Sequence, residues 1–445
     1  QLAQASLRLL NLRENECRFA LALLVVLAIN SVVLELADVV ATAGFVSSLG
    51  ADKVPWLWIA DMVVALLVAS VFAKAIDRAP RLQVLSWLIG ALAAVYLVTL
   101  IMFEAGLPDW ITYPLLYIVS DQQFMMLPLA FWALVNDVYT MSEAKRLIPI
   151  IAAGTALGSV IGNSLPALTA LIIAPDDAGY LIVLAVLLLL ASLGLLQFTF
   201  RARVVRARSA KPDTTGLVDN LRVGADFFMN LPLFRYLAIS MLLVGLALTI
   251  IEFNLLSLLE QSFATSLAFQ AFYGLYKAAL ITCLVIFQAL ITGRLLQRVA
   301  MRNGYLALPS ALLIASGLAL LAPGLAGAAG GRFLARFVER AWDEPLRKAT
   351  LALVPDERRG RISVFLDSYF FTAATLAGSV LLLLIFQLRG GLPVSAQITA
   401  LAVAALAAAG AVWASLRARS AYGASLLNWR LARSRRKSVL DGIDF

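Results

Sequence analysis

The residues of this sequence that could do chemistry are charged and polar side chains embedded in long apolar segments. An ionisable group in the middle of a membrane-spanning helix is costly, so it needs a partner, a hydrated cavity or a functional role. Several of these groups recur three or four residues apart, which places them on one helical face. We predict that the following residues line a solute-binding cavity: Glu35, Asp38, Asp121, Glu252, Tyr273, Lys277, Arg332 and Arg336.

The cations among these residues favour the binding of an anion. Arginine presents a planar fork that matches a phosphate or a carboxylate, and lysine presents a mobile point charge. We therefore expect Lys277, Arg332 and Arg336 to contact an anionic solute. The structural alternative is that acid–base pairs hold the helices together, with Glu35 or Asp38 against Lys277 or Arg336.

Several kinds of chemistry are excluded by the residue types. The sequence has no histidine and only two cysteines, Cys17 and Cys283, so Ser-His-Asp catalysis, zinc hydrolysis and imidazole proton relays are ruled out. We predict that the protein is not an enzyme, has no catalytic or metal-binding residues and uses no cofactor. A desolvated carboxylate is the remaining proton carrier, and Glu35, Asp38 and Glu252 qualify by position.

The composition shows which elements must position these residues. Hydrophobic residues make up 62% of the 445, against roughly 45–50% in soluble proteins, and charged residues make up 14%, against roughly 25%. This balance excludes a soluble enzyme, a secreted disulfide scaffold and a disordered chain. We predict an all-α membrane protein with twelve transmembrane helices. The predicted spans cover residues 19–46, 55–77, 83–104, 110–136, 147–173, 179–200, 234–260, 267–292, 303–325, 328–354, 362–388 and 392–416.

The basic residues predict the orientation of these spans. Of the 36 Lys and Arg residues, 30 lie in the segments on the side of the N-terminus, and such an excess marks the cytoplasmic face. Both termini are therefore expected in the cytoplasm. Frequent Ala, Leu and Arg favour the inner membrane of a bacterium. Since the membrane accounts for the net charge of +9, we expect no nucleic-acid partner.

The chain is expected to divide into two six-helix halves. Its parts are an N-terminal bundle at 1–200, a cytoplasmic linker at 201–233, a C-terminal bundle at 234–416 and a basic tail at 417–445. Apolar residues at helical spacing in the linker predict an interfacial helix, with a plain linker as the alternative. We expect the tail to bind anionic lipid headgroups, or to lead into a cytosolic regulatory domain beyond residue 445.

Charged turns recur at corresponding places in the two halves. Spans four and ten both end on acidic residues, and the loops after spans two and eight are basic. We predict that these acids and bases pair to gate the cytoplasmic side; the alternative is that the charges only set orientation. The expected gating residues are Asp77, Arg78, Arg81, Asp137, Lys145, Arg146, Asp343 and Glu344.

The whole pattern resembles the major facilitator superfamily, whose fold is a pair of six-helix pseudo-repeats. The resemblance rests on twelve spans, cytoplasmic ends, a long central loop and the turn Asp77-Arg78-x-x-Arg81. A narrower resemblance is to the bacterial and plastid ATP/ADP translocase branch. It is carried by Phe131-Trp132, Asn136-Asp137, Ala144-Lys145-Arg146, Gly154 and Gly158.

The narrower resemblance implies exchange of nucleotides across a membrane, and some relatives have a further regulatory domain after the transporter. In known translocators the first span brings a basic residue near the substrate phosphates. Here the corresponding stretch is acidic, with Glu35 and Asp38. The sequence thus departs from the branch at the position where a phosphate would be bound.

Small residues predict close helix packing in the fifth span. Gly154, Gly158 and Gly162 recur every four residues, a pattern typical of helices whose backbones approach closely. The functional alternative is that this face slides against the eighth span during transport.

These observations predict an alternating-access antiporter or other secondary transporter for a small anionic, phosphorylated and nucleotide-like solute. One alternative is a proton-coupled carrier of cationic or amphipathic compounds, favoured by Glu35 and Asp38. The other is a membrane sensor or scaffold that no longer transports and is coupled to a cytosolic regulatory domain. A tail helix continuous with the twelfth span and a cavity closed by ion pairs would favour the sensor, whereas an open, hydrated, basic cavity would favour transport.

Overall fold

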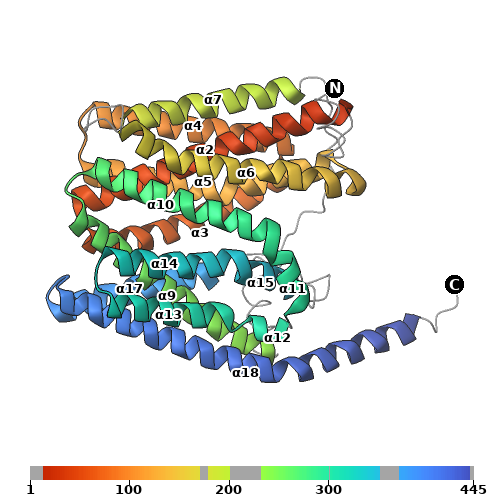
Figure 1. Ribbon diagram of the computed structural model, residues 1–445. Helices are drawn as coiled ribbons and strands as arrows, with labels where there is room; N and C mark the ends of the chain where they lie inside the picture. Colours follow the sequence, from red (N-terminus) through yellow and green to blue (C-terminus); the bar gives the residue numbers. More distant parts are fainter. Residues whose placement is uncertain (1–13, 171–178, 201–231, 300, 351–369, 441–445) are drawn as a thin grey trace. The chain divides into compact units, whose positions relative to one another are not determined.

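The computed structural model describes residues 14–170, 179–200, 232–299, 301–350 and 370–440, and within this part of the chain all regular elements are helices, without strands. The elements of the first half of the sequence, whose α-helices are labelled in Figure 1, are α2 (Glu14–Leu49), η1 (Ala51–Lys53), α3 (Val54–Arg78), α4 (Arg81–Glu104), α5 (Asp109–Val138), α6 (Met141–Ala170) and α7 (Gly179–Phe200). Those of the second half are α9 (Pro232–Ser262), α10 (Ser266–Phe287), η2 (Gln288–Thr292), α11 (Gly293–Arg298), α12 (Met301–Gly304), α13 (Ala307–Leu321), α14 (Leu325–Val338), η3 (Glu339–Asp343), α15 (Glu344–Thr350), α17 (Phe371–Arg389) and α18 (Val394–Leu440).

Ten helices in the described residues are long and apolar enough to cross a membrane. They agree with ten of the predicted spans, and the span at 179–200 matches to the residue. The expected span at 328–354 is not among them, because α14, η3 and α15 carry a stripe of charged residues. The expected span at 55–77 forms α3, part of whose side chains the structure does not describe. The protein is a multi-pass membrane protein, and the total of twelve spans stays a prediction.

The chain forms two compact units. The first comprises residues 1–53, 63–213 and 263–285, and the second comprises 54–62, 214–262 and 286–445. Residues 263–285, which include most of α10, thus pack with the first unit. The expected linker at 201–233 lies almost wholly outside the described residues, as does the interfacial helix predicted there.

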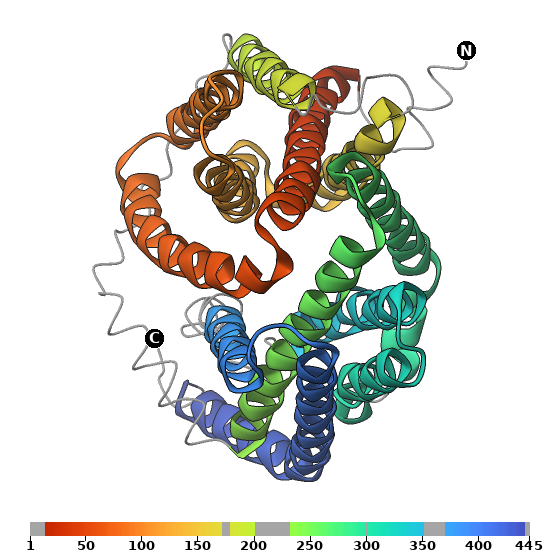
Figure 2. The same cartoon turned by 90° about the vertical axis from the view of Figure 1, so that its left-hand side faces the viewer.

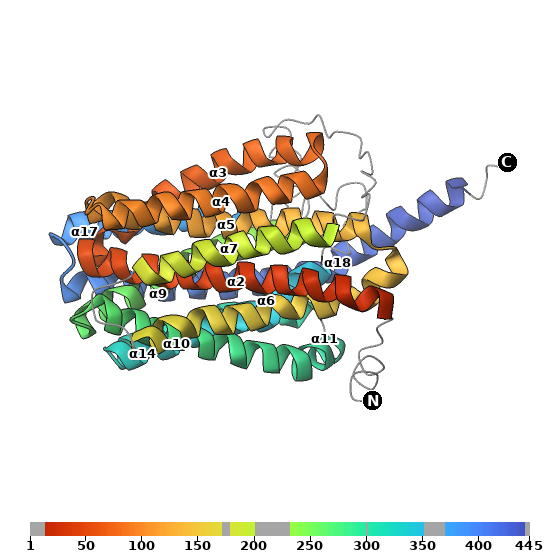
Figure 3. The ribbon, with the colours of Figure 1, turned by 90° about the horizontal axis from the view of Figure 1, so that it is seen from above.

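In the first unit, α2 lies at the centre and packs against α5, α6 and α7 (Figure 3). The fully buried side chains of its core include Leu27, Tyr96 and Phe131. From Phe19 to Val46, every side chain of α2 except Leu21 is buried or half-buried, as is typical of a helix within a bundle. A charged residue on α2 must therefore find its partner inside the protein.

In the second unit, α9 packs against α14, α17 and α18, and the pair of α9 and α18 is visible in Figure 2, in light green and dark blue. Small residues bring these helices close together: a side chain at Gly245 would meet Ala374, and one at Gly378 would meet Thr249. A buried hydrogen bond joins the hydroxyls of Ser240 and Ser415 at 3.0 Å.

The helix α18 continues from the last predicted span into the basic tail as one element, Val394–Leu440. Its side chains are described as far as residue 421. A tail helix of this kind is the feature that favours the sensor alternative, because a continuous helix can carry movement of the bundle outward.

The glycine series of α6 packs against α2, as expected for a small-residue interface. A Cβ atom at Gly154 would lie 2.5 Å from the Leu24 carbonyl oxygen, and one at Gly162 would lie 2.5 Å from that of Val32. A Cβ atom at Gly158 would press on the Ala28 carbonyl and lie 2.8 Å from Ser31 Cβ. These are backbone contacts, which cannot move aside, so glycine is required here.

We expect Gly158→Ala to destabilise the protein by about 1–3 kcal/mol, because the added methyl group overpacks the contact between α2 and α6. Gly194→Ala on α7 is the matched control, since nothing lies within 4 Å of the added atom. Alanine there should be neutral or stabilising by up to about 1 kcal/mol. Thermal unfolding of the detergent-purified variants measures both, and equal melting temperatures would contradict this account of the interface.

Candidate functional site

The first cluster of charges joins α10 to α2 within the first unit. Lys277 Nζ lies 2.7 Å from Glu35 Oε2 and 2.6 Å from Asp38 Oδ2. The predicted pairing of these acids with Lys277 is confirmed. The carboxylates are three residues apart on α2, so both face the same ammonium group. Thr42, one turn further along, donates a hydrogen bond to Asp38 Oδ1 at 3.4 Å.

The close approach of α10 depends on Gly274, one turn before Lys277. A Cβ atom at this position would collide with the carbonyl oxygen of Asn163 on α6. The neighbouring Tyr273 is buried, and its ring centre lies 5.7 Å from Lys277 Nζ, within the range of a cation–π contact. Tyr273 was a predicted site residue, whereas the spacing pattern gave no reason to select Gly274.

A buried chain of hydrogen bonds crosses the same unit. Gln123 donates from Nε2 to Asn30 Oδ1 at 2.7 Å and accepts from the Tyr96 hydroxyl at 2.7 Å. The side chains of Tyr96 and Gln123 are fully buried. This network joins α2, α4 and α5, and it satisfies polar groups that would otherwise be unpaired in an apolar interior. Tyr96 was not a predicted residue, because a single tyrosine in an apolar run does not by itself indicate a buried polar network.

The second cluster lies within the second unit and joins α14 to α9. Glu252 Oε2 accepts from Arg332 Nε at 2.6 Å and from Arg336 Nη2 at 3.3 Å. Arg336 also donates from Nη1 to Glu339 Oε2 at 2.9 Å. The arginines are four residues apart and present both guanidinium groups to one carboxylate. The structure thus brings together three predicted site residues and adds Glu339.

Taken together, the two clusters have four carboxylates and three cations. Lys277, Arg332 and Arg336 were expected to contact an anionic solute, yet carboxylates of the same unit already hold each of them. Breaking such a pair exposes a charge that the surrounding apolar helices cannot stabilise. An anion can therefore bind these cations only if it replaces a carboxylate.

Two further acids lie in apolar helices. Asp121 is a predicted site residue; it is half-buried on α5, two residues before Gln123. Asp61 on α3 is 1% exposed and was not predicted, although a lone carboxylate in an apolar run was an available signal. No group of three potential metal ligands occurs among the residues that the structure describes.

The expected gating residues are only partly described. Arg81 Nε lies 3.7 Å from Asp137 Oδ2, which agrees with the pairing predicted for the first half. In the second half, Asp343 pairs with Arg347 at 2.8 Å and Glu344 pairs with Lys348 at 2.5 Å, each one turn further along the helix. Their expected partners, Arg294 and Arg298, are exposed instead. Arg146 is half-buried, and the side chains of Asp77, Arg78 and Lys145 lie outside the description.

We expect Lys277→Met to destabilise the protein by about 3 kcal/mol, because it leaves two carboxylates together in an apolar helix bundle. The triple substitution Glu35→Gln, Asp38→Asn and Lys277→Met removes all three charges and should recover most of this loss. The control is Lys53→Met, at an exposed position. Thermal unfolding in detergent is the measurement; a single variant as stable as the wild type would show that the pairing contributes little.

Comparisons with known proteins place these features in a family. The chain shares the major facilitator fold with solved transporters. The nucleoside transporter NupG has a TM-score of 0.65 and 12% identity, over 91% of this chain and 99% of that one. A bacterial homologue of the human lysosomal transporter Spinster has a TM-score of 0.59 and 14% identity, over 94% and 98%. The POT family transporter PepTSo has a TM-score of 0.61 and 13% identity, over 91% of this chain and 98% of that one.

No curated protein matches the chain. The TLC ATP/ADP transporter family matches residues 91–322, slightly more than half of the chain, which include the glycine series, Glu252 and Lys277. The protein is a membrane transporter and not an enzyme. The chain belongs to the TLC ATP/ADP transporter family.

Proposed function

We propose that this transporter exchanges a nucleotide-type solute across the bacterial inner membrane by alternating access, with both termini in the cytoplasm. The family match supports the solute class, and the bias of basic residues supports the orientation. The observation that carries the proposal is the arginine pair of α14: Arg332 and Arg336 are four residues apart and share the single carboxylate of Glu252. Two guanidinium groups that donate to one carboxylate oxygen form an arrangement that also suits a phosphate.

The binding step follows from this geometry. A phosphate group carries more oxygen acceptors than the Glu252 carboxylate and can engage both arginine forks at once. When it replaces Glu252, that carboxylate loses its partners and is stabilised by taking up a proton or by turning to water. Glu339 keeps one side of Arg336 in place throughout. The resting ion pairs therefore position the arginines and keep the empty carrier neutral at this cluster.

The charge balance also limits the solute. The second cluster has two carboxylates and two arginines, so no surplus positive charge is available there for a polyphosphate. Each additional phosphate charge would have to be compensated by another displaced carboxylate. We therefore propose that a nucleotide with a single phosphate group is preferred over a triphosphate, in keeping with the acidic Glu35 and Asp38 on α2.

The test is uptake of labelled AMP and ATP into vesicles that contain the purified protein. AMP uptake should exceed ATP uptake, and Arg336→Gln should lower it roughly tenfold or more, since hydrogen bonds to charged groups contribute about 1.5–3 kcal/mol. Arg389→Gln is the matched control, because Arg389 is exposed at the end of α17. Uptake that is unaffected by Arg336→Gln would rule out the arginine pair as the phosphate site.

A proton-coupled carrier of cationic or amphipathic compounds is the second candidate. It is favoured by the first cluster, where Glu35 and Asp38 face only one cation, Lys277. In a chain without histidine, such a pair of carboxylates is where one proton or one cationic group would be accepted.

This candidate makes a separate prediction. An imposed pH gradient should drive uptake of a fluorescent organic cation by the wild type. Asp38→Asn should abolish this dependence, because the remaining carboxylate is matched by Lys277. Asp52→Asn, at an exposed position in η1, is the control. Cation uptake that responds to the gradient equally in all three proteins would exclude this role for the cluster.

The continuous helix α18 supports a third candidate function, a membrane sensor. Transport and sensing differ in what the vesicles show: a protein that only senses binds its solute without moving it. Binding of AMP in detergent, combined with a lack of uptake for every compound in the vesicles, would favour the sensor.

A further inference from the structure

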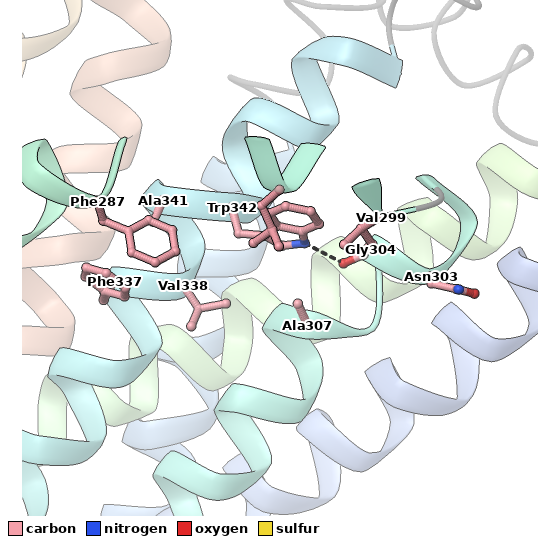
Figure 4. A pocket seen from close by; sticks show the side chains of 10 residues that line it. Phe287, Val299, Asn303, Gly304, Ala307, Phe337, Val338, Ala341 and Trp342 are labelled. Carbon is pink, nitrogen blue, oxygen red and sulfur yellow. Dashed lines mark hydrogen bonds between the residues drawn. The ribbon is translucent and has the colours of Figure 1, made fainter. Parts of the chain in front are cut away.

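A pocket of about 320 Å³ lies within the second unit, and Figure 4 shows the side chains that line it. It sits where one candidate span, Ser266–Arg298, ends and the next, Arg302–Leu321, begins. This is the level at which acyl chains give way to headgroups in a bilayer. Its walls are almost entirely apolar and include Phe287, Leu295, Val299, Phe337, Val338 and Trp342.

Two π-helical segments shape this pocket. Gln288 on η2 donates from Nε2 to the Arg340 carbonyl of η3 at 3.0 Å, and Thr292 donates to the Ala341 carbonyl at 3.1 Å. The side chains of one π segment thus satisfy the backbone of the other. Short π segments within α-helices frequently occur at functional sites, and these hydrogen bonds join the two helices beside the pocket.

The far wall is fixed by Trp342. Its indole Nε1 donates to the Gly304 carbonyl at 2.9 Å, as Figure 4 shows, and the ring is buried. A Cβ atom at Gly304 would lie 2.6 Å from Leu346 Cδ2 and 3.2 Å from the Trp342 ring. The pocket is therefore preformed, because hydrogen bonds and close packing hold its walls.

Three exposed arginines flank the pocket: Arg294 and Arg298 on α11, and Arg302 on α12. They are sequence neighbours of lining residues Leu295, Val299 and Asn303. The nearby acids Asp343 and Glu344 pair with Arg347 and Lys348, as described above. Within the described part of the chain, no ion pair neutralises the three arginines, so the rim of an apolar pocket carries concentrated positive charge.

We propose that this pocket binds an anionic phospholipid, with an acyl chain between Phe337, Val338 and Trp342 and the phosphate against Arg298 and Arg302. Apolar walls alone would accept any acyl chain, and arginines alone would accept any phosphate. Only a molecule with both parts, present at this depth of a membrane, matches the whole site. The proposal is independent of the transported solute, because none of these residues belongs to either charge cluster.

The probes are phosphatidylglycerol and phosphatidylcholine with identical acyl chains, added to the full-length protein in detergent. Native mass spectrometry counts the bound lipid, and thermal unfolding measures its effect. We expect phosphatidylglycerol to bind more tightly and to raise the melting temperature more than phosphatidylcholine does. The double substitution Arg298→Gln and Arg302→Gln should weaken phosphatidylglycerol binding roughly tenfold or more. The reason is that it removes the attraction of two cations to the anionic headgroup. Arg389→Gln should leave it unchanged.

A second variant tests the apolar part. Ala307→Leu places a larger side chain into the pocket, where Figure 4 shows the Ala307 methyl group, and should displace both lipids. Ala402→Leu on the exposed face of α18 is the matched control. The arginine variant keeps the proposal testable even if Ala307→Leu does not fold, because its side chains are exposed.

Three outcomes would overturn the proposal. Equal binding of the two lipids by the wild type would remove the role of the arginines. Full stabilisation by inorganic phosphate or AMP alone would identify a soluble anion as the ligand. A mass of two chains in light scattering that is lost in Ala307→Leu would identify a second copy of this chain as the occupant.

Discussion

Compensation of charge inside apolar helices is the constraint on which this structure depends. Lys277 lies between Glu35 and Asp38, and Glu252 lies between Arg332 and Arg336. An ammonium group, a guanidinium group or a carboxylate that is removed from water is tolerated only when an opposite charge and hydrogen bonds take the place of the solvent. These contacts join α2 to α10 in one unit and α9 to α14 in the other. The ion pairs thus hold helices together and also occupy the groups that a solute would need.

Close helix packing makes this compensation possible. Gly274 lets α10 approach α6, and Gly154, Gly158 and Gly162 let α6 approach α2, so that Lys277 reaches its acids. Inside a membrane, small residues at an interface replace the hydrophobic effect as the source of association, because lipid and leucine are equally apolar. These glycines therefore help to position Lys277 against its acids, although they do not themselves contact a charged group.

The chain departs from a simple basic cavity in a way that is consistent with its acidic first helix. Its cations are matched within their own units, and the surplus is of carboxylates. Exposed arginines, for which the described residues provide no ion pair, lie instead beside the apolar pocket at the end of α11, where we propose a bound lipid. The two kinds of site differ in burial. The charge clusters are buried and pair their charges within the protein, whereas the arginines beside the pocket are exposed, where the membrane surface can compensate their charge.

Residue type and spacing by themselves determined the membrane class, most helix bounds and the shared helical face of Glu35 and Asp38, because apolar length and helical period are local properties. They left Lys277 and Arg336 as alternative partners for these acids, and the structure decided for Lys277. The helical spacing of the charged residues on α14, including Arg332 and Arg336, could also be recognised in the sequence. Only the tertiary structure decided that Glu252 is their shared partner, that Tyr96 and Gln123 complete a buried network, and that Asp343 pairs along its own helix. Those contacts depend on how helices distant in sequence approach and rotate about their axes. The period of a single helix carries no information about its neighbour.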